Sequence, residues 1–384
     1  MKTNAPVSVR SIDTYDEQKI TEILREQMNT LGYDNAFFEK KKVVIKPNLV
    51  MKKAPDAAAT THPVVLSALL TVLGERGVSP IIAESPGGLF NRQRLEGVYR
   101  MCGIAEVAER HHVELSYDTE AVFVPFPNGK TVKTFHVIRP IAEADVVIDL
   151  CKLKSHGLTK MSAAIKNFFG VIPGVEKFEM HATFPDYKDF GSMICDLCQM
   201  LYEQKEIIAI TDAIIGMEGD GPTAGTPRKI GALLMSANPF ASDIVGETLL
   251  GFENTVPIVR EAVSRGLCPA DISGVTLLGD DIRPLCISDF KEPETAENGA
   301  DFSCPVRKPF PIYARVAENV SHLVLSIPSS LSKSMAKKLP RYAMQIVSVA
   351  IAVRSFVRLG QSKSRKISSS KSQADSKHQK GDYI

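Results

Sequence analysis

Short apolar runs alternate along most of the chain with longer stretches of helical periodicity. The runs predict strands at Val7–Val9, Val43–Ile45, Ile81–Ala83, Val146–Leu150, Ile207–Thr211, Ala232–Met235 and Val275–Leu278. The stretches between them predict amphipathic helices, most clearly at Glu17–Leu31, Pro63–Glu75, Ser192–Glu203 and Ala241–Leu250. Strands that are apolar on both faces are typical of a parallel sheet covered on both sides. We therefore expect an α/β fold, with a mainly parallel sheet and helices on both faces.

The charge of the chain divides unevenly between its body and its end. Of 384 residues, 44% are hydrophobic and 23% are charged, which is typical of a folded protein. Residues 331–384 carry 12 Lys and Arg against 2 Asp and Glu, so the net charge of +2 combines an acidic body with a basic end. We expect an α/β core over residues 1–290, a linker and degenerate segment over 291–343, and a tail that is largely disordered after residue 360. The acidic body argues against nucleic acid as a partner.

The cysteines and the apolar segments bear on the cellular compartment. The seven cysteines have no regular spacing, and the N-terminus lacks a secretory signal, so we expect a reducing, cytoplasmic location. The apolar stretch Ala343–Val353 is well short of the roughly 20 residues that a membrane span requires. The pattern therefore predicts no membrane partner.

A first group of candidate ligand-binding residues follows two predicted element boundaries. Lys46 and Asn48 come at the end of one strand, and Thr60 and Thr61 immediately precede a helix. Ligands of open α/β sheets lie beyond the carboxyl ends of the strands, and a helix N-terminus favours anions. These residues could therefore hold a phosphate or carboxylate; the alternative is a strand-end turn followed by an ordinary helix cap.

A second, denser group follows the strand predicted at Val146–Leu150. It contains Lys152, Lys154 and His156, and Lys166 and Asn167 come soon afterwards on or after a helix. The lysines and Asn167 are candidates for an anion site, and His156 for proton transfer or for binding a metal. The alternative is a charged loop in contact with solvent.

Carboxylates form the third group of candidates. Glu84 ends a predicted strand, Asp212 follows another, and Glu218 lies in a glycine-rich turn. With His156 they are the candidates for acid/base catalysis. Their spacing lacks the ligand ladder of an EF-hand, so no metal site is assigned. The pair Cys195 and Cys198 lies within a helical pattern, which favours packing over thiol chemistry.

Five ordered blocks resemble domain-of-unknown-function family 362 over roughly residues 7–279. They are Val44–Asn48, Thr60–Pro63, Lys152–Gly157, Ala164–Gly170 and Gly216–Pro222. Members of that family commonly continue into a ferredoxin-like module that binds [4Fe–4S] clusters. The resemblance thus implies redox chemistry and a redox partner, whereas the reaction of the main domain is not established.

This chain departs from the family at the cluster motif. No cysteine follows Cys304, so the motif C-x2-C-x2-C-x3-C-P is absent and no cofactor is assigned. In a shifted reading frame, the codon junctions Ile346/Val347, Val349/Ala350, Ala352/Val353 and Phe356/Val357 can encode four cysteines at that spacing. We hypothesise a frameshift between about Cys304 and Met344, which makes residues 344–384 a remnant of the module. Coincidence is the alternative, and the coding DNA decides between them.

Three functions follow as expectations. The first is a redox-associated protein that binds an anionic small molecule at the carboxyl edge of its sheet. The second is a non-redox acid/base or metal-dependent enzyme. The third is a ligand-binding protein without turnover.

Overall fold

The strands of the core form a mixed, mostly parallel sheet. The computed structural model describes residues 5–293, and all of them except Phe178–Thr183 belong to one compact unit. Nine strands pair in the order β11-β1-β10-β9-β7-β2-β3-β4, with β8 attached to β7. Their bounds are β1 Val7–Ser11, β2 Val43–Pro47, β3 Ile81–Ile82, β4 Glu114–Leu115, β7 Val146–His156, β8 Lys160–Ser162, β9 Glu206–Glu218, β10 Thr226–Ser236 and β11 Leu277–Gly279. The basic tail and the proposed frameshifted remnant lie outside the described residues.

The directions of two strands, β10 and β8, separate this sheet from a purely parallel one, and β8 is antiparallel to β7. Strands β9, β7, β2, β3 and β4 run parallel to their neighbours in that order, and β1 is parallel to β11. Strand β10 is antiparallel to both β9 and β1. A separate hairpin pairs β5 (Ala121–Pro125) with β6 (Thr134–Ile138). The expected α/β class with a mainly parallel sheet is therefore confirmed.

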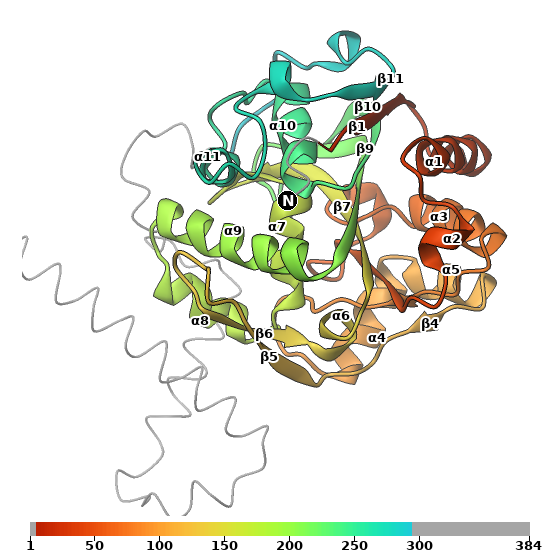
Figure 1. The fold of residues 1–384 in the computed structure, drawn as a ribbon, viewed down its shortest axis with the longest axis horizontal. Helices are drawn as coiled ribbons and strands as arrows, with labels where there is room; N and C mark the ends of the chain where they lie inside the picture. Colours follow the sequence, from red (N-terminus) through yellow and green to blue (C-terminus); the bar gives the residue numbers. More distant parts are fainter. Residues whose placement is uncertain (1–4, 294–384) are drawn as a thin grey trace, which may run out of the picture. The chain divides into compact units, whose positions relative to one another are not determined.

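Helices cover both faces of the sheet, as Figure 1 shows. One face carries α1 (Glu17–Thr30), α3 (Pro63–Glu75) and α5 (Ile104–Arg110). The other carries α7 (Ala164–Asn167), α9 (Tyr187–Gln204), α10 (Pro239–Leu249) and α11 (Pro257–Ser264). The remaining helices are α2 Asn35–Phe38, α4 Arg92–Met101, α6 Arg139–Ala142 and α8 Glu176–Thr183. No helix within residues 5–293 is long and apolar enough to cross a membrane.

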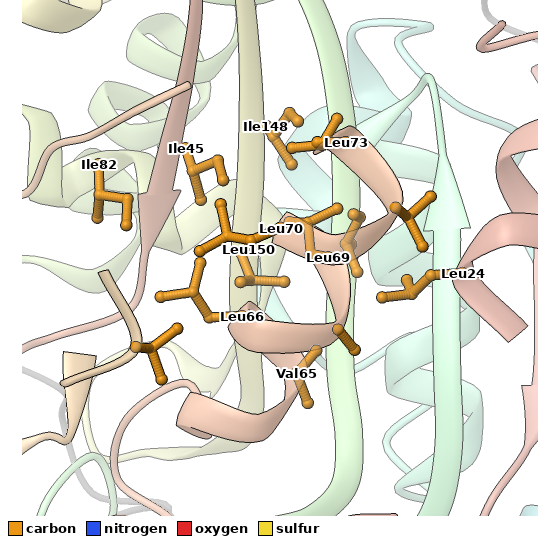
Figure 2. Packing of buried hydrophobic residues seen from close by; sticks show 14 of the residues in the cluster. Leu24, Ile45, Val65, Leu66, Leu69, Leu70, Leu73, Ile82, Ile148 and Leu150 are labelled. Carbon is orange, nitrogen blue, oxygen red and sulfur yellow. The ribbon is translucent and has the colours of Figure 1, made fainter. Parts of the chain in front are cut away.

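The core between α3 and the sheet explains why these segments adopt their structures. Leu66, Leu69 and Leu70 of α3 pack on Ile45 of β2 and on β7 (Figure 2). Helix α3 begins where His62 caps the N–H of Val64 and Pro63 occupies the first helical position. In each central strand, every second side chain lies on the side of the sheet away from this core. These side chains include polar ones. Alternation thus delivers polar side chains to the interior near the strand ends.

The position of the polar residues along β7 and β9 corrects one sequence-based expectation. The strand predicted to end at Leu150 continues to His156, so Lys152 and Lys154 lie within it rather than in a loop. Asp212 likewise lies inside β9 and pairs in register with Lys152. The prediction was wrong because β8 and β9 supply backbone partners to this polar stretch, and such partners cannot be identified locally.

Candidate functional site

Lys46 is the first centre of the candidate site. It lies at the end of β2, where it pairs in register with Asp149 of β7, and its side chain is fully buried. Its Nζ donates to Glu84 Oε2 at 3.0 Å and to Asn167 Oδ1 at 3.1 Å. A buried ammonium is stable only when it is paired and hydrogen-bonded, and these contacts meet that requirement.

Asn167 connects Lys46 to neighbouring strands. Its Nδ2 donates to Asp149 Oδ1 at 2.6 Å, and its Oδ1 accepts from Asn48 Nδ2 at 2.8 Å. Helix α7 presents Asn167 here because Asp243 of α10 accepts the N–H groups of Ala164 and Ile165 at 2.8 and 3.1 Å. The two asparagines predicted as ligand-binding residues are therefore in direct contact.

Asn48 extends the connection to Lys154. Lys154 Nζ donates to Asn48 Oδ1 at 2.9 Å and to the carbonyl of Ala59, and its side chain is 1% exposed. The hydroxyl of Thr61 accepts the N–H of Asn48 at 2.8 Å and donates to the carbonyl of Leu150 at 2.6 Å. Thr60 is buried beside it. The loop before α3 is thus connected by hydrogen bonds to the end of β2 and to β7.

Two further lysines lie near Lys46. Lys177 Nζ donates to the carbonyls of Ser85 and Ile172 at 2.5 and 2.6 Å, and Glu84 and Lys46 are near enough to influence its pKa. The half-buried Lys166 adjoins Asn167 and is near enough to Lys46 for that charge to lower its pKa. We call Lys46, Lys154, Lys166 and Lys177 together the lysine cluster.

The electrostatics of the lysine cluster are unbalanced. Burial, reinforced by neighbouring ammonium groups, lowers the pKa of Lys154, Lys166 and Lys177 to about 7 in each case. Burial raises the pKa of Asp149 well above its usual range, which weakens its contribution of negative charge. Four lysines therefore share this region with Glu84 and Asp149, while Asp243 and Glu176 are near enough to influence the pKa of Asp149 and of Lys177 respectively.

A second buried group lies on the α3 side of the sheet. Lys152 Nζ donates to Asp212 Oδ2 and to the hydroxyl of Tyr15, both at 2.7 Å. The ring of His62 stacks on that of Tyr15 with centroids 3.6 Å apart, and the backbone N–H of His62 donates to Asp212 Oδ2 at 3.1 Å. Burial lowers the pKa of His62 to about 4, so the ring is neutral at pH 7. Lys152 and Asp212 neutralise one another, in contrast to the lysine cluster.

His156 and Glu218 have other partners. His156 Nδ1 accepts the N–H groups of Leu158 and Thr159 at 3.2 and 3.3 Å, which stabilises the turn from β7 to β8. Glu218 ends β9 and accepts the N–H of Lys291 at 3.2 Å. The hydrogen bonds of His156 stabilise that turn, and the hydrogen bond of Glu218 connects the end of β9 to Lys291, whereas the acid/base role of both residues remains a prediction.

A glycine allows the close packing around Lys46. A methyl group built on Gly170 would collide with the ends of the Glu84 and Lys46 side chains. The Gly170 carbonyl also accepts the N–H of Ser85 at 3.0 Å. Any side chain at Gly170 would therefore have to displace the ends of Glu84 and Lys46, so glycine suits this close approach.

Some residues of the site were not identified as functional from the sequence. Tyr15 and Lys177 lie outside the three groups of candidate residues, and no local spacing in the sequence links them to the site. Asp149 lies within an otherwise apolar predicted strand. The indication available from the sequence was a charged residue among neighbours that are buried. Asp149 and Lys177 contribute directly to the charge balance of the lysine cluster.

The described cysteines do not suit an iron–sulfur cluster. Within residues 5–293, no three His, Cys, Asp or Glu side chains form a group that could hold a metal ion. Cys195 and Cys198 are buried inside α9, where burial raises the pKa of both thiols. A [4Fe–4S] cluster requires four thiolate ligands, which this part of the chain does not bring together.

The comparisons with known proteins agree with the resemblance read from the sequence. The chain is 29% identical over 297 residues to a thylakoid-associated protein of Synechocystis sp., an alignment that covers 75% of this chain and 88% of that protein. The model of a family described as a domain of unknown function, DUF362, matches residues 43–247, which include both buried polar groups apart from Tyr15. This chain therefore belongs to the DUF362 family.

Proposed function

We propose that this protein binds a small anionic molecule within the lysine cluster, at the carboxyl edge of its sheet. The observation that supports the proposal is the imbalance of buried charge. Lys46 donates to the carboxylate of Glu84, whereas the buried Lys154 and Lys177 donate to neutral oxygen atoms among the described residues. Hydrogen bonds to neutral groups only partly offset the cost of removing an ammonium group from water. An anion would supply the missing negative charge.

The same imbalance gives anion binding a distinctive signature. Lysines with pKa values of about 7 are about half protonated at pH 7. A bound anion raises these pKa values, because it favours the charged form of each lysine. Binding at pH 7 should therefore take up protons, whereas binding to ordinary surface lysines, which are already protonated, should take up none.

Isothermal titration calorimetry with citrate, inorganic phosphate and pyrophosphate tests the proposal. Titrations at pH 7 in two buffers of different ionisation enthalpy measure both affinity and proton uptake. We expect Lys46→Ala and Lys154→Ala to weaken binding by about 10- to 100-fold, since each removes a charge-assisted hydrogen bond worth roughly 1.5–3 kcal/mol.

Lys205→Ala is the matched control. Lys205 immediately precedes β9, at the N-terminal end of that strand rather than at the carboxyl edge of the sheet. Its Nζ donates to the carbonyl of Ala142 at 2.7 Å. This variant should bind the probes as the unmodified protein does. Unchanged affinity in the Lys46 and Lys154 variants, with their folds intact by circular dichroism, would rule out the lysine cluster as the anion site.

The redox role, the acid/base or metal-dependent alternatives and the cytoplasmic location remain predictions. The relative from Synechocystis is associated with thylakoids, which is a property of that protein. Anion binding is compatible with a redox-associated protein and with a binding protein without turnover. Turnover of a bound anion, once one is found, distinguishes these functions.

A further inference from the structure

Lys166 differs from the other members of the lysine cluster in what holds its amine. Its Nζ lies 4.6 Å from the ring centroid of Phe169 and 5.6 Å from that of Phe190. The other three lysines donate to oxygen atoms, whereas the Lys166 amine forms no hydrogen bond to a residue within 5–293. The Lys166 side chain is half-buried and reaches solvent, while both rings are buried. Aromatic faces therefore hold this amine in place of hydrogen bonds.

The two rings form a rigid support for the charge of Lys166. Phe169 lies in the short helix Phe168–Val171 and Phe190 in α9, and their centroids are 5.4 Å apart in an edge-to-face arrangement. Both rings are closely packed, which fixes their orientation. An ammonium group within about 6 Å of a ring centroid is attracted to the face of that ring. This attraction favours the charged form of Lys166 and opposes the effect of burial on its pKa.

This arrangement leaves the hydrogen-bonding capacity of Lys166 available. An ammonium group has three N–H donors, and the two rings attract its charge without offering an oxygen acceptor to any of them. A flexible lysine loses rotamer freedom when it binds a ligand, whereas a side chain that is already held loses less. Lys166 therefore combines a positioned charge with donors that a ligand can use.

We infer that Lys166 is the lysine of the cluster that contacts the anion directly, and that Phe169 and Phe190 are its positioning residues. The inference rests on the proposed anion binding and names the groups that meet the ligand. Lys166 and Lys154 are near enough for their charges to interact, so the other lysines add positive charge to this contact. The ligand class that fits is a carboxylate or phosphate, whose oxygens accept charge-assisted hydrogen bonds from an ammonium group.

Calorimetric titration of the full chain with citrate, inorganic phosphate and pyrophosphate at pH 7 tests the inference. Lys166→Met should weaken binding about tenfold or more, since it removes the direct contact. Lys166→Arg keeps the charge, the donors and the attraction to aromatic faces, so it should bind within about threefold of the unmodified protein. Phe169→Leu should weaken binding by about three- to tenfold, and Phe169→Tyr, which keeps the ring face, should restore it.

A double-mutant cycle separates positioning from packing. If Phe169 acts through Lys166, Phe169→Leu should change the affinity by less than about twofold once Lys166 is methionine. An equal loss of affinity with and without the lysine overturns the positioning role. Phe37→Leu is the matched control, because Lys41 Nζ lies 4.0 Å from the ring centroid of Phe37 in α2, outside the lysine cluster. This control should bind the probes as the unmodified protein does.

Nuclear magnetic resonance of protein labelled with 13C-lysine gives a readout that does not depend on a ligand. Protons above an aromatic face resonate upfield, so the ε-methylene signal of Lys166 should lie upfield of that of the exposed Lys40. Lys166→Arg assigns the signal by its disappearance, and Phe169→Leu should move it downfield. Equal positions for the two lysines in the unmodified protein overturn the inference.

The failure of this inference is distinguishable from that of the proposed function. Unchanged affinity in Lys166→Met, while Lys46→Ala and Lys154→Ala weaken binding, overturns the direct contact and leaves anion binding intact. Absence of binding of all three probes to the unmodified protein overturns both proposals.

Discussion

Replacing Lys154 with methionine should stabilise the ligand-free protein. Lys154 is buried, and its ammonium donates to two neutral oxygens, those of Asn48 and Ala59. Its pKa is about 7 in the folded protein, against about 10.4 in an unfolded chain. At pH 7 this difference favours the unfolded state by about 4 kcal/mol. Methionine keeps most of the apolar stem and leaves two acceptors unpaired, at roughly 1 kcal/mol each, so we expect a net gain of about 2 kcal/mol.

The pH dependence has a defined sign. A lysine whose pKa is lowered on folding destabilises the folded state fully below the lowered value. That destabilisation disappears as the pH rises toward the unfolded pKa. At pH 9.5 only about 1 kcal/mol of it remains, so Lys154→Met should then be slightly less stable than the unmodified protein. Urea unfolding at pH 7 and pH 9.5 measures both differences.

The control and the refuting result are both clear. Lys205→Met removes a lysine outside the cluster, which donates to a single carbonyl, and should change stability by less than about 1 kcal/mol at either pH. If Lys154→Met instead destabilises the protein by 2 kcal/mol or more at both pH values, Lys154 is chiefly a structural hydrogen-bond donor. That result would refute the destabilising effect assigned to the Lys154 charge.

Three further predictions concern Asn167, Gly170 and the binding of an iron–sulfur cluster. Asn167→Ala removes contacts to Lys46, Asn48 and Asp149 and should lower the free energy of unfolding in urea by roughly 3–4 kcal/mol. The control Asn91→Ala removes one helix-cap hydrogen bond and should lower it by about 1 kcal/mol. Equal losses of stability in the two variants would contradict the central role of Asn167. Gly170→Ala should cost about 1–3 kcal/mol by crowding Glu84, whereas Gly74→Ala, which meets open space in α3, should be neutral or stabilising in the same thermal melts. The full chain should bind no stoichiometric [4Fe–4S] cluster after anaerobic reconstitution, and about four irons per protein in metal analysis would show otherwise.

The sequence predicted best those elements whose signals are local. Helix α3 has the predicted bounds, Pro63–Glu75, because both its cap and its apolar periodicity lie within one stretch of chain. The strands were located but not fully delimited, since β7 continues through Lys152 and Lys154 by pairing with β8 and β9. The antiparallel direction of β10 also depends on distant partners.

The candidate site was predictable to a similar degree. Residue types at strand ends pointed to Lys46, Asn48 and Lys154, which the structure connects by hydrogen bonds through asparagine side chains. The charge balance was not predictable, because it depends on Asp149 and Lys177. Both become relevant only through three-dimensional packing that no spacing in the sequence indicates.

The position of β1 has a consequence for the order in which this protein assembles during synthesis. β1 lies between β10 and β11, where Val7 pairs with Ser236 on one side and with Leu277 on the other. A ribosome therefore releases the first strand of the core long before either of its partners has been made. Strands β2, β3 and β7 follow one another with fewer intervening residues and can pair earlier. β1 can pair only after β10 has been made, and β11, whose one partner in the described sheet is β1, can join only after β1. Until β10 is available, the unpaired backbone of β1 is open to association with other chains.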